Sequence, residues 1–187
     1  MNIVIMGCGR VGARLARMFD HEGHQVAVID LSSQALERLD TDFHGVTIVG
    51  TGIDEDVLKH AGIEQADVFL ALTSLDNPNI MAAQIATTMF KVPRVITRIY
   101  DPAREDTFHE MGLETICPTT LVADRIYRAV ETNSVEPLDD GVVEPLPGET
   151  LARTHTATMP VTESHDEEPP PDRRENHPSW RQRIFRQ

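Results

Sequence analysis

The sequence is short of basic residues and of long apolar runs, and both shortages exclude classes of protein. Its 187 residues carry 17 lysines and arginines against 30 aspartates and glutamates, a formal net charge of −13 at pH 7. A nucleic-acid-binding surface needs a basic face that neutralises phosphates, so we expect no nucleic-acid partner. No apolar run approaches the ~20 residues that a membrane-spanning helix needs.

Cysteines and metal-binding motifs are scarce as well. Cys8 and Cys117 are the only cysteines, which fits a reducing cytoplasm better than a disulfide framework. The chain has no Cys-x-x-Cys and no His-Glu-x-x-His, and we expect no metal site. Met1 leads directly into an apolar segment, so we also expect no cleaved leader.

The most informative stretch is a Gly-x-Gly-x-x-Gly motif between two predicted strands. Its glycines are Gly7, Gly9 and Gly12, and the second strand, over 25–29, ends at Asp30. In a βαβ unit such glycines allow a tight turn, close approach of the backbone to a phosphate, and close packing of helix on sheet. The helix N-terminus then faces the phosphates. The acid accepts hydrogen bonds from ribose hydroxyls and disfavours a 2′-phosphate, so we predict NAD or an adenosine nucleotide rather than NADP.

Strand and helix alternate six times in about 130 residues, a pattern typical of parallel sheets covered by helices on both faces. We predict an α/β fold, a Rossmann-like doubly wound parallel six-stranded sheet of order 3-2-1-4-5-6, with a disordered C-terminal tail. Ligands of such sheets bind beyond the carboxyl ends of the strands. The segments expected to converge there are 7–12, Asp30, 50–52, 73–74 and Arg98.

The composition changes near residue 135. Eight of the twelve prolines follow that point, and apolar periodicity is lost. We therefore expect a nucleotide-binding domain over 1–134 and a Pro-rich, mostly disordered tail over 135–187. The last fifteen residues mix arginines with Trp180, Ile184 and Phe185. Two interpretations stay open for them: a solvated tail, or a short docking peptide for a partner or an anionic membrane surface.

Five segments together resemble the TrkA N-terminal family, the RCK/KTN domains. They are Met-Gly-Cys-Gly-Arg-Val-Gly at 6–12, Val-Ile-Asp at 28–30, Gly-Thr-Gly at 50–52, Ala-Gly-Ile-Glu-Gln-Ala-Asp at 61–67 and Leu-Thr-Ser-Leu-Asp-Asn at 72–77. The resemblance extends over residues 1 to about 132. It implies a cytoplasmic subunit that regulates potassium uptake systems or potassium channels.

The resemblance also implies a ligand and partners. The ligand is NAD(H) or ATP/ADP, and the partners are a membrane-embedded potassium transporter subunit and further copies in a homodimer or higher oligomer. The protein would lie in the cytoplasm, peripheral to the inner face of the membrane through that partner. The implied cofactor-binding residues are Gly7, Cys8, Gly9, Arg10, Val11, Gly12, Asp30, Thr51, Thr73, Ser74 and Arg98. Among them, Arg10 has its own physical reason, because a guanidinium in the first helical turn can bond a β- or γ-phosphate.

Two departures from the family pattern affect these expectations. The family commonly has Gly-Asp-Ala where this chain has Gly-Thr-Gly, so a carboxylate near the adenine is replaced by Thr51. Many members also carry a second, smaller domain, for which the tail is too poor in apolar pattern. The chain therefore resembles a short form that works beside a second, longer TrkA-type subunit or through the nucleotide domain alone.

Two other classes of function remain to be weighed. The first is a small NAD-dependent oxidoreductase, but the chain shows neither a substrate domain nor long insertions, and its histidines are better interpreted as solvated. The second is a structural module whose nucleotide site has lapsed, against which the intact glycines and Asp30 argue. We predict a regulator and not an enzyme.

Overall fold

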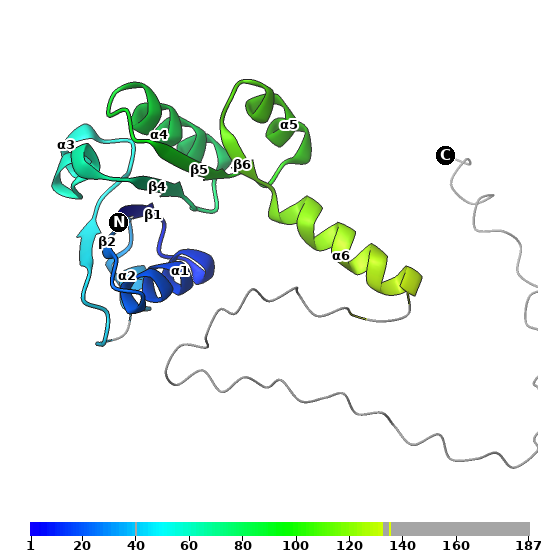
Figure 1. Ribbon diagram of the computed structural model, residues 1–187, viewed down its shortest axis with the longest axis horizontal. Coiled ribbons are helices and arrows are strands. Elements are labelled where there is room, and N and C mark those ends of the chain that lie inside the picture. The colour runs from blue at the N-terminus through cyan, green and yellow to red at the C-terminus, as the bar shows by residue number, and fades with distance from the viewer. Residues whose placement is uncertain (40, 133–134, 136–187) are drawn as a thin grey trace, which may run out of the picture. The chain divides into compact units, whose positions relative to one another are not determined.

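Six parallel strands form one sheet in the computed structural model of the chain, which describes residues 1–39, 41–132 and 135 (Figure 1). Their order is β3-β2-β1-β4-β5-β6, so the predicted doubly wound sheet is confirmed. The strands are β1 (Asn2–Met6), β2 (Gln25–Asp30), β3 (Val46–Val49), β4 (Val68–Ala71), β5 (Arg94–Arg98) and β6 (Glu114–Ile116). The order in which strands are added to the sheet reverses between β1 and β4, and this is the switch point where ligands of such sheets bind.

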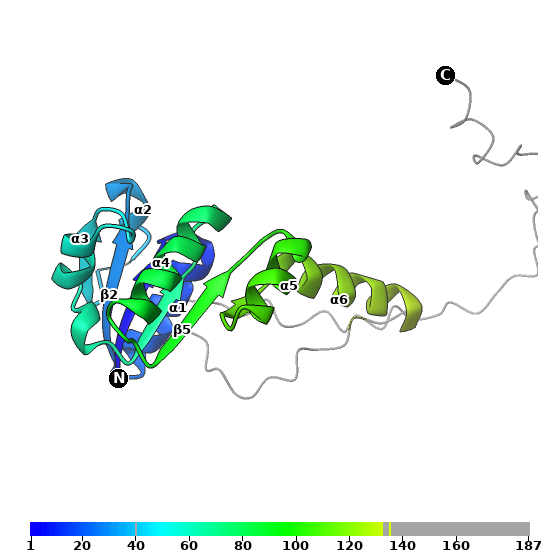
Figure 2. The ribbon, with the colours of Figure 1, turned by 90° about the horizontal axis from the view of Figure 1, so that it is seen from above.

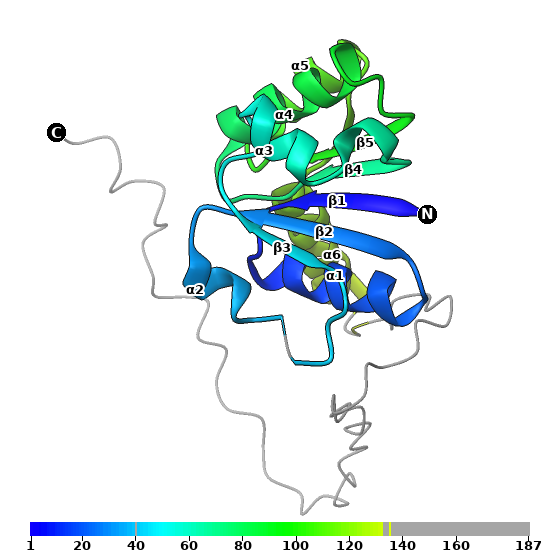
Figure 3. The same ribbon diagram turned by 90° about the vertical axis from the view of Figure 1, so that its left-hand side faces the viewer.

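Helices cover the two faces of this sheet. The helices are α1 (Arg10–His21), α2 (Ser33–Leu36), α3 (Glu55–His60), α4 (Asp76–Thr88), α5 (Pro102–Glu110) and α6 (Pro118–Thr132), with a 3₁₀ turn η1 (Ile63–Gln65) after α3. Figure 3 shows α1 and α2 on one side of the strands and α3, α4 and α5 on the other. Strand β1 is buried on both sides because its residues alternate between the two cores, with Ile3 and Ile5 facing α1 and with Val4 and Met6 facing α3 and α4.

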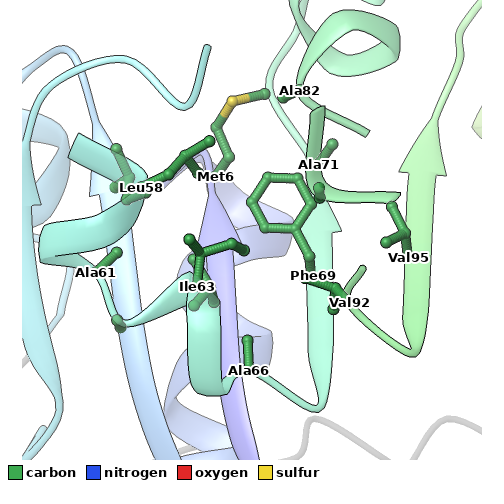
Figure 4. Close-up of a cluster of buried hydrophobic side chains, with 14 of the residues drawn as sticks. Met6, Leu58, Ala61, Ile63, Ala66, Phe69, Ala71, Ala82, Val92 and Val95 are labelled. Carbon is green, nitrogen blue, oxygen red and sulfur yellow. The ribbon is translucent and has the colours of Figure 1, made fainter. Parts of the chain in front are cut away.

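The larger core lies between the sheet and helices α3 and α4 (Figure 4). Phe69 of β4 is its largest fully buried side chain, and burial of such a side chain contributes roughly 1.5–3 kcal/mol. The face of α4 that meets the sheet is made of small residues, Ala82, Ala83 and Ala86, all 0 % exposed. Small side chains allow the helix to approach the strands closely, so α4 is covered by the sheet of its own chain.

Local signals in the sequence set the boundaries of several helices. The Asp54 carboxylate accepts from the Asp56 N–H at 2.8 Å and begins α3. The Asp101 carboxylate accepts from the Ala103 N–H at 3.0 Å, and Pro102 is the first residue of α5. Gly62, with φ +80°, follows the last turn of α3 in the left-handed conformation of a C′ glycine.

One predicted helix is much shorter in the structure. The sequence predicts a helix over 32–43, but α2 ends at Leu36. Leu39 and Phe43 nevertheless pack against the core on the α1 side. Thr41 and Asp42 have low helix propensity, so an irregular segment buries the two apolar side chains instead of a further helical turn.

Helix α6 differs from the other long helices because it leaves the sheet after β6 and extends away from it (Figures 1 and 2). None of its residues is buried. No helix in the described part of the chain is both long and apolar enough to cross a bilayer. Apart from Val135, the predicted tail over 135–187 and its candidate docking peptide lie outside the described residues.

Candidate functional site

The glycine motif forms a tight turn at the carboxyl end of β1. Gly7 has φ +105°, and a Cβ on it would lie 2.9 Å from the Thr73 amide nitrogen. A Cβ on Gly12 would collide with the Gly7 carbonyl oxygen. The Gly7 N–H donates to the Ile29 carbonyl at 2.7 Å. Any larger residue at either position would therefore collide with the backbone where β1, α1 and β4 pack together.

Gly9 is different, because the fold itself does not require a glycine there. Its φ of −73° and ψ of −170° suit any residue. Apart from its chain neighbours, no atom of the described residues lies within 4 Å of the place where a Cβ would stand. It is also the N-cap of α1 and gives the first turn no side-chain acceptor. The unpaired N–H groups of that turn and the open space beside Gly9 are what a phosphate needs to approach the backbone.

Asp30, predicted to bind a ribose, forms hydrogen bonds to the backbone at the glycine turn. One carboxylate oxygen accepts from the Cys8 N–H at 2.7 Å, and the other accepts from the Ser32 N–H at 2.9 Å. Each carboxylate oxygen accepts more than one hydrogen bond, so a ribose hydroxyl can still bind. The acid thus holds the turn in place at the edge where the nucleotide is expected.

Cys8 lies fully buried inside this turn. Burial raises the pKa of its thiol, the charge of Asp30 raises that pKa further, and the charge of Arg38 opposes both. A thiol held in the neutral form is a poor nucleophile. The geometry therefore favours Cys8 as a small residue that fits the turn, over a redox role.

Two of the predicted site residues at this edge are cations without a carboxylate partner among the residues that the structure describes. Arg10 is exposed at the start of α1, and its side chain forms no hydrogen bond or ion pair with a described residue. Arg98, at the end of β5, donates to the Thr73 carbonyl at 2.8 Å and lies 4.7 Å from the centre of the Tyr100 ring. Its Nε atom is buried without an acceptor. Uncompensated cations in a chain of net charge −13 favour an anionic ligand at this edge.

Asn79 is a site residue that the sequence analysis missed. This side chain is fully buried. It accepts from the Thr73 N–H at 3.0 Å and the Thr73 hydroxyl at 2.7 Å, and donates to the carbonyls of Thr73 at 3.0 Å and Arg98 at 2.9 Å. It therefore fixes the ends of β4 and β5 relative to each other. The available signal was an amide on the apolar face of a helix, four residues before Ala83 and seven before Ala86.

We expect Asn79→Leu to lower the free energy of unfolding by about 3 kcal/mol, because it leaves the Thr73 amide and the Arg98 carbonyl without these partners, whereas the Thr73 carbonyl keeps its bond from Arg98. Urea denaturation measures this loss. The control is Gln84→Leu on the exposed face of α4, where we expect a change within about 0.5 kcal/mol. Equal stability of the two variants would show that the buried amide is not needed.

The structure brings the other predicted site residues to the same edge of the sheet. Thr73 is joined to Gly7 by close packing and to Arg98 by a hydrogen bond. Thr51 follows Gly50, whose N–H donates to the Asp30 carbonyl at 2.9 Å. Val11 and Ser74 are exposed, in the first turn of α1 and in the loop after β4. The predicted convergence of these loops on one edge thus agrees with the contacts of their backbones.

An open hollow of about 510 Å³ adjoins this edge between the loops after β4 and β5. Two hydrogen bonds shape it: the Tyr100 N–H donates to Asp76 at 2.9 Å, and the Arg104 guanidinium donates to Asn77 at 2.6 Å. Such a volume is in the range of small-ligand sites. Its lining residues are Ser74, Leu75, Asp76, Asn77, Pro78, Tyr100 and Arg104.

Comparison with known proteins gives consistent relatives. The TrkA-N domain family model matches residues 3–118. The Trk system potassium uptake protein TrkA of Streptomyces coelicolor is 43% identical over 158 residues, which cover 84% of this chain and 70% of that protein. A TrkA homolog of Pyrococcus abyssi is 36% identical over 138 residues, which cover 71% of this chain and 61% of that protein.

Solved structures share the fold at low identity. The TrkA-N domain of the inner membrane protein ybaL from Escherichia coli has a TM-score of 0.62 at 16% identity, covering 69% of this chain and 96% of that one. The C-terminal domain of Kef from Shewanella denitrificans, in its AMP-bound form, has a TM-score of 0.59 at 17% identity, covering 71% and 82%. The GsuK channel bound to NAD has a TM-score of 0.56 at 19% identity, covering 67% and 22%.

Proposed function

We propose, from the premise that this chain belongs to the TrkA-N domain family, that it is a nucleotide-binding regulatory subunit of a potassium transport system. One observation carries the nucleotide part of this proposal. Among the described residues, an open space that the fold does not need lies beside Gly9, which follows the Cys8 N–H bonded by Asp30 and precedes Arg10. The curated relatives are named as potassium uptake proteins, which favours regulation over the oxidoreductase interpretation.

The proposed ligand is NAD(H) or ATP/ADP. Its phosphates would lie on the first turn of α1 with Arg10, and its adenosine ribose on Asp30. A dinucleotide would extend towards Thr73, Arg98 and the hollow beyond them, because the second half of a doubly wound sheet receives the second nucleotide. The GsuK channel bound to NAD and the AMP-bound Kef domain support this class of ligand.

The proposed mechanism is a shift between two conformations. A ligand biases such an equilibrium only by the difference between its affinities for the two states. NADH differs from NAD by a hydride, and ATP differs from ADP by a phosphate that Arg10 can reach. We propose that these differences at the crevice decide which state prevails.

A chain of contacts leads from the crevice to the exposed helix α6. Asn79 joins Thr73 to Arg98, and Arg98 stacks on Tyr100. The Tyr100 carbonyl then accepts from the Thr119 hydroxyl at 2.7 Å, in the first turn of α6. We propose that α6 carries the change to further copies of the chain and to a membrane-embedded potassium transporter subunit.

The proposed location follows from that partner: the cytoplasm, at the inner face of the membrane. A second, longer TrkA-type subunit belongs to the proposed assembly as well. The division into a nucleotide-binding domain over 1–134 and a tail over 135–187 also remains a proposal.

We expect Asp30→Ala to weaken NADH binding at least tenfold, because hydrogen bonds to a charged group are each worth about 1.5–3 kcal/mol. Calorimetric titration measures the affinity, and circular dichroism verifies the fold. Asp67→Ala is the matched control, since Asp67 also accepts a backbone N–H, that of Asn2 at 2.7 Å, but at the opposite end of β1. Unchanged NADH affinity in Asp30→Ala would contradict the proposed ribose site.

A further inference from the structure

Arg38 is a cation at the nucleotide edge that the sequence analysis did not consider. It lies in the turn after α2 and reaches back to the glycine motif, where its Nη1 atom donates to the Cys8 carbonyl at 3.4 Å. A second bond, to the Ala35 carbonyl, measures 3.5 Å. The side chain is exposed, and no carboxylate of the described residues forms an ion pair with it.

Arg38 and Asp30 hold opposite sides of the same residue. Asp30 accepts from the Cys8 N–H, whereas Arg38 donates to the Cys8 carbonyl. Their opposite effects on the pKa of the Cys8 thiol also show that both charges lie near it. The acid at the end of the second strand faces the 2′ and 3′ positions of the adenosine ribose. A guanidinium that contacts the same residue, Cys8, as this acid is therefore within reach of the 2′ position.

Both contacts of Arg38 are long, near the limit of a hydrogen bond. The guanidinium therefore loses little when it turns towards a ligand. Asp30, in contrast, is fixed by two short bonds to backbone N–H groups. A 2′-phosphate would be repelled by the fixed carboxylate, but it would gain charge-assisted and bidentate bonds to the arginine.

We propose that Arg38 forms an anion site for a 2′-phosphate at the ribose end of the crevice, so that this chain binds NADP(H) as well as NAD(H). The inference rests on the proposed function, because it concerns the same crevice. It also changes the expectation drawn from Asp30 alone, which disfavours a 2′-phosphate when no arginine stands beside the acid.

The test is calorimetric titration of the full chain with NADH and with NADPH, at low and at moderate salt. We expect the unaltered protein to bind NADPH within about tenfold of NADH. Arg38→Ala should weaken NADPH binding about 10- to 100-fold and NADH binding less than about threefold.

Arg38→Lys should keep part of the NADPH affinity, because it retains the charge and loses the bidentate geometry. NADPH binding should also fall more steeply with salt.

Arg128→Ala is the control, because it removes the same charge from an exposed position on α6. It should change neither affinity. Strong NADH binding with no NADPH binding overturns the inference and leaves the proposed function standing. Equal weakening of both ligands in Arg38→Ala overturns it too, because Arg38 would then contact a part that the two ligands share. Failure of the unaltered protein to bind NADH or NADPH overturns the inference, and it contradicts the proposed function only when ATP and ADP do not bind either.

Discussion

Replacing Gly12 by alanine is expected to unfold the domain or to cost it at least about 3 kcal/mol of stability. The added Cβ would collide with the Gly7 carbonyl oxygen. Backbone atoms cannot move aside as a flexible side chain can, so α1 would have to separate from β1. Such a loss is a large part of the roughly 5–15 kcal/mol that stabilises an ordinary domain. Urea denaturation measures it.

The same substitution at Gly9 should leave stability unchanged and weaken nucleotide binding. In the part of the chain that the structure describes, no atom beyond the neighbouring residues lies within 4 Å of the new Cβ, so we expect stability within about 0.5 kcal/mol of the unaltered chain. Nucleotide affinity, measured by calorimetry, should fall about 100-fold, because the methyl group would take the space through which a phosphate reaches the backbone. Full nucleotide affinity in Gly9→Ala would contradict the proposed phosphate site. Full stability in Gly12→Ala would contradict the packing of the turn.

Substitution of Ile126 by aspartate is expected to weaken self-association at least about 100-fold. Helix α6 buries none of its residues, and one face presents Val122, Ile126 and Val130, which are 57%, 60% and 75% exposed. An apolar face of this kind marks an interface, and we propose a second copy of the chain as its partner. A charge in the middle of such an interface would be buried without a partner.

Sedimentation velocity over a range of concentrations measures this effect. Thr120→Asp places the same charge on the other side of α6, at an exposed position, and should leave self-association unchanged. An assembly that survives Ile126→Asp would show that α6 is not the contact. It would favour instead the exposed side of α4, where Met81 and Met89 are 51% and 52% exposed.

Much of the fold was predictable because its signals are local. The alternation of strand and helix indicates a parallel sheet, and the N-caps Asp54 and Asp101 begin helices through bonds to residues two positions further along the chain. Helix α4 was harder. The structure shows that its apolar face packs on the sheet of its own chain. From the sequence alone, an apolar helix of this kind could equally pack against a partner. Helix α6 has a clearer amphipathic pattern than α4, but its apolar face is exposed.

The site was predictable only in outline. The motif indicates Gly7, Gly9, Gly12 and Asp30 because each residue type has a local task. The bonds that organise them join distant residues. Arg38 and Cys8 are 30 positions apart, and Asn79 and Arg98 are 19 apart. Such pairs depend on the tertiary fold, so a sequence pattern does not reveal them.

Calorimetric titration of the unaltered protein with NADH, NAD, ATP and ADP at fixed salt tests nucleotide sensing most directly. A nucleotide-sensing subunit should bind at least one pair with an affinity difference of about tenfold or more between its members, because an affinity difference is what shifts a conformational equilibrium. That result would also name the signal. Equal, weak binding of all four nucleotides would contradict the account and leave the chain as a scaffold for a sensor located in another subunit.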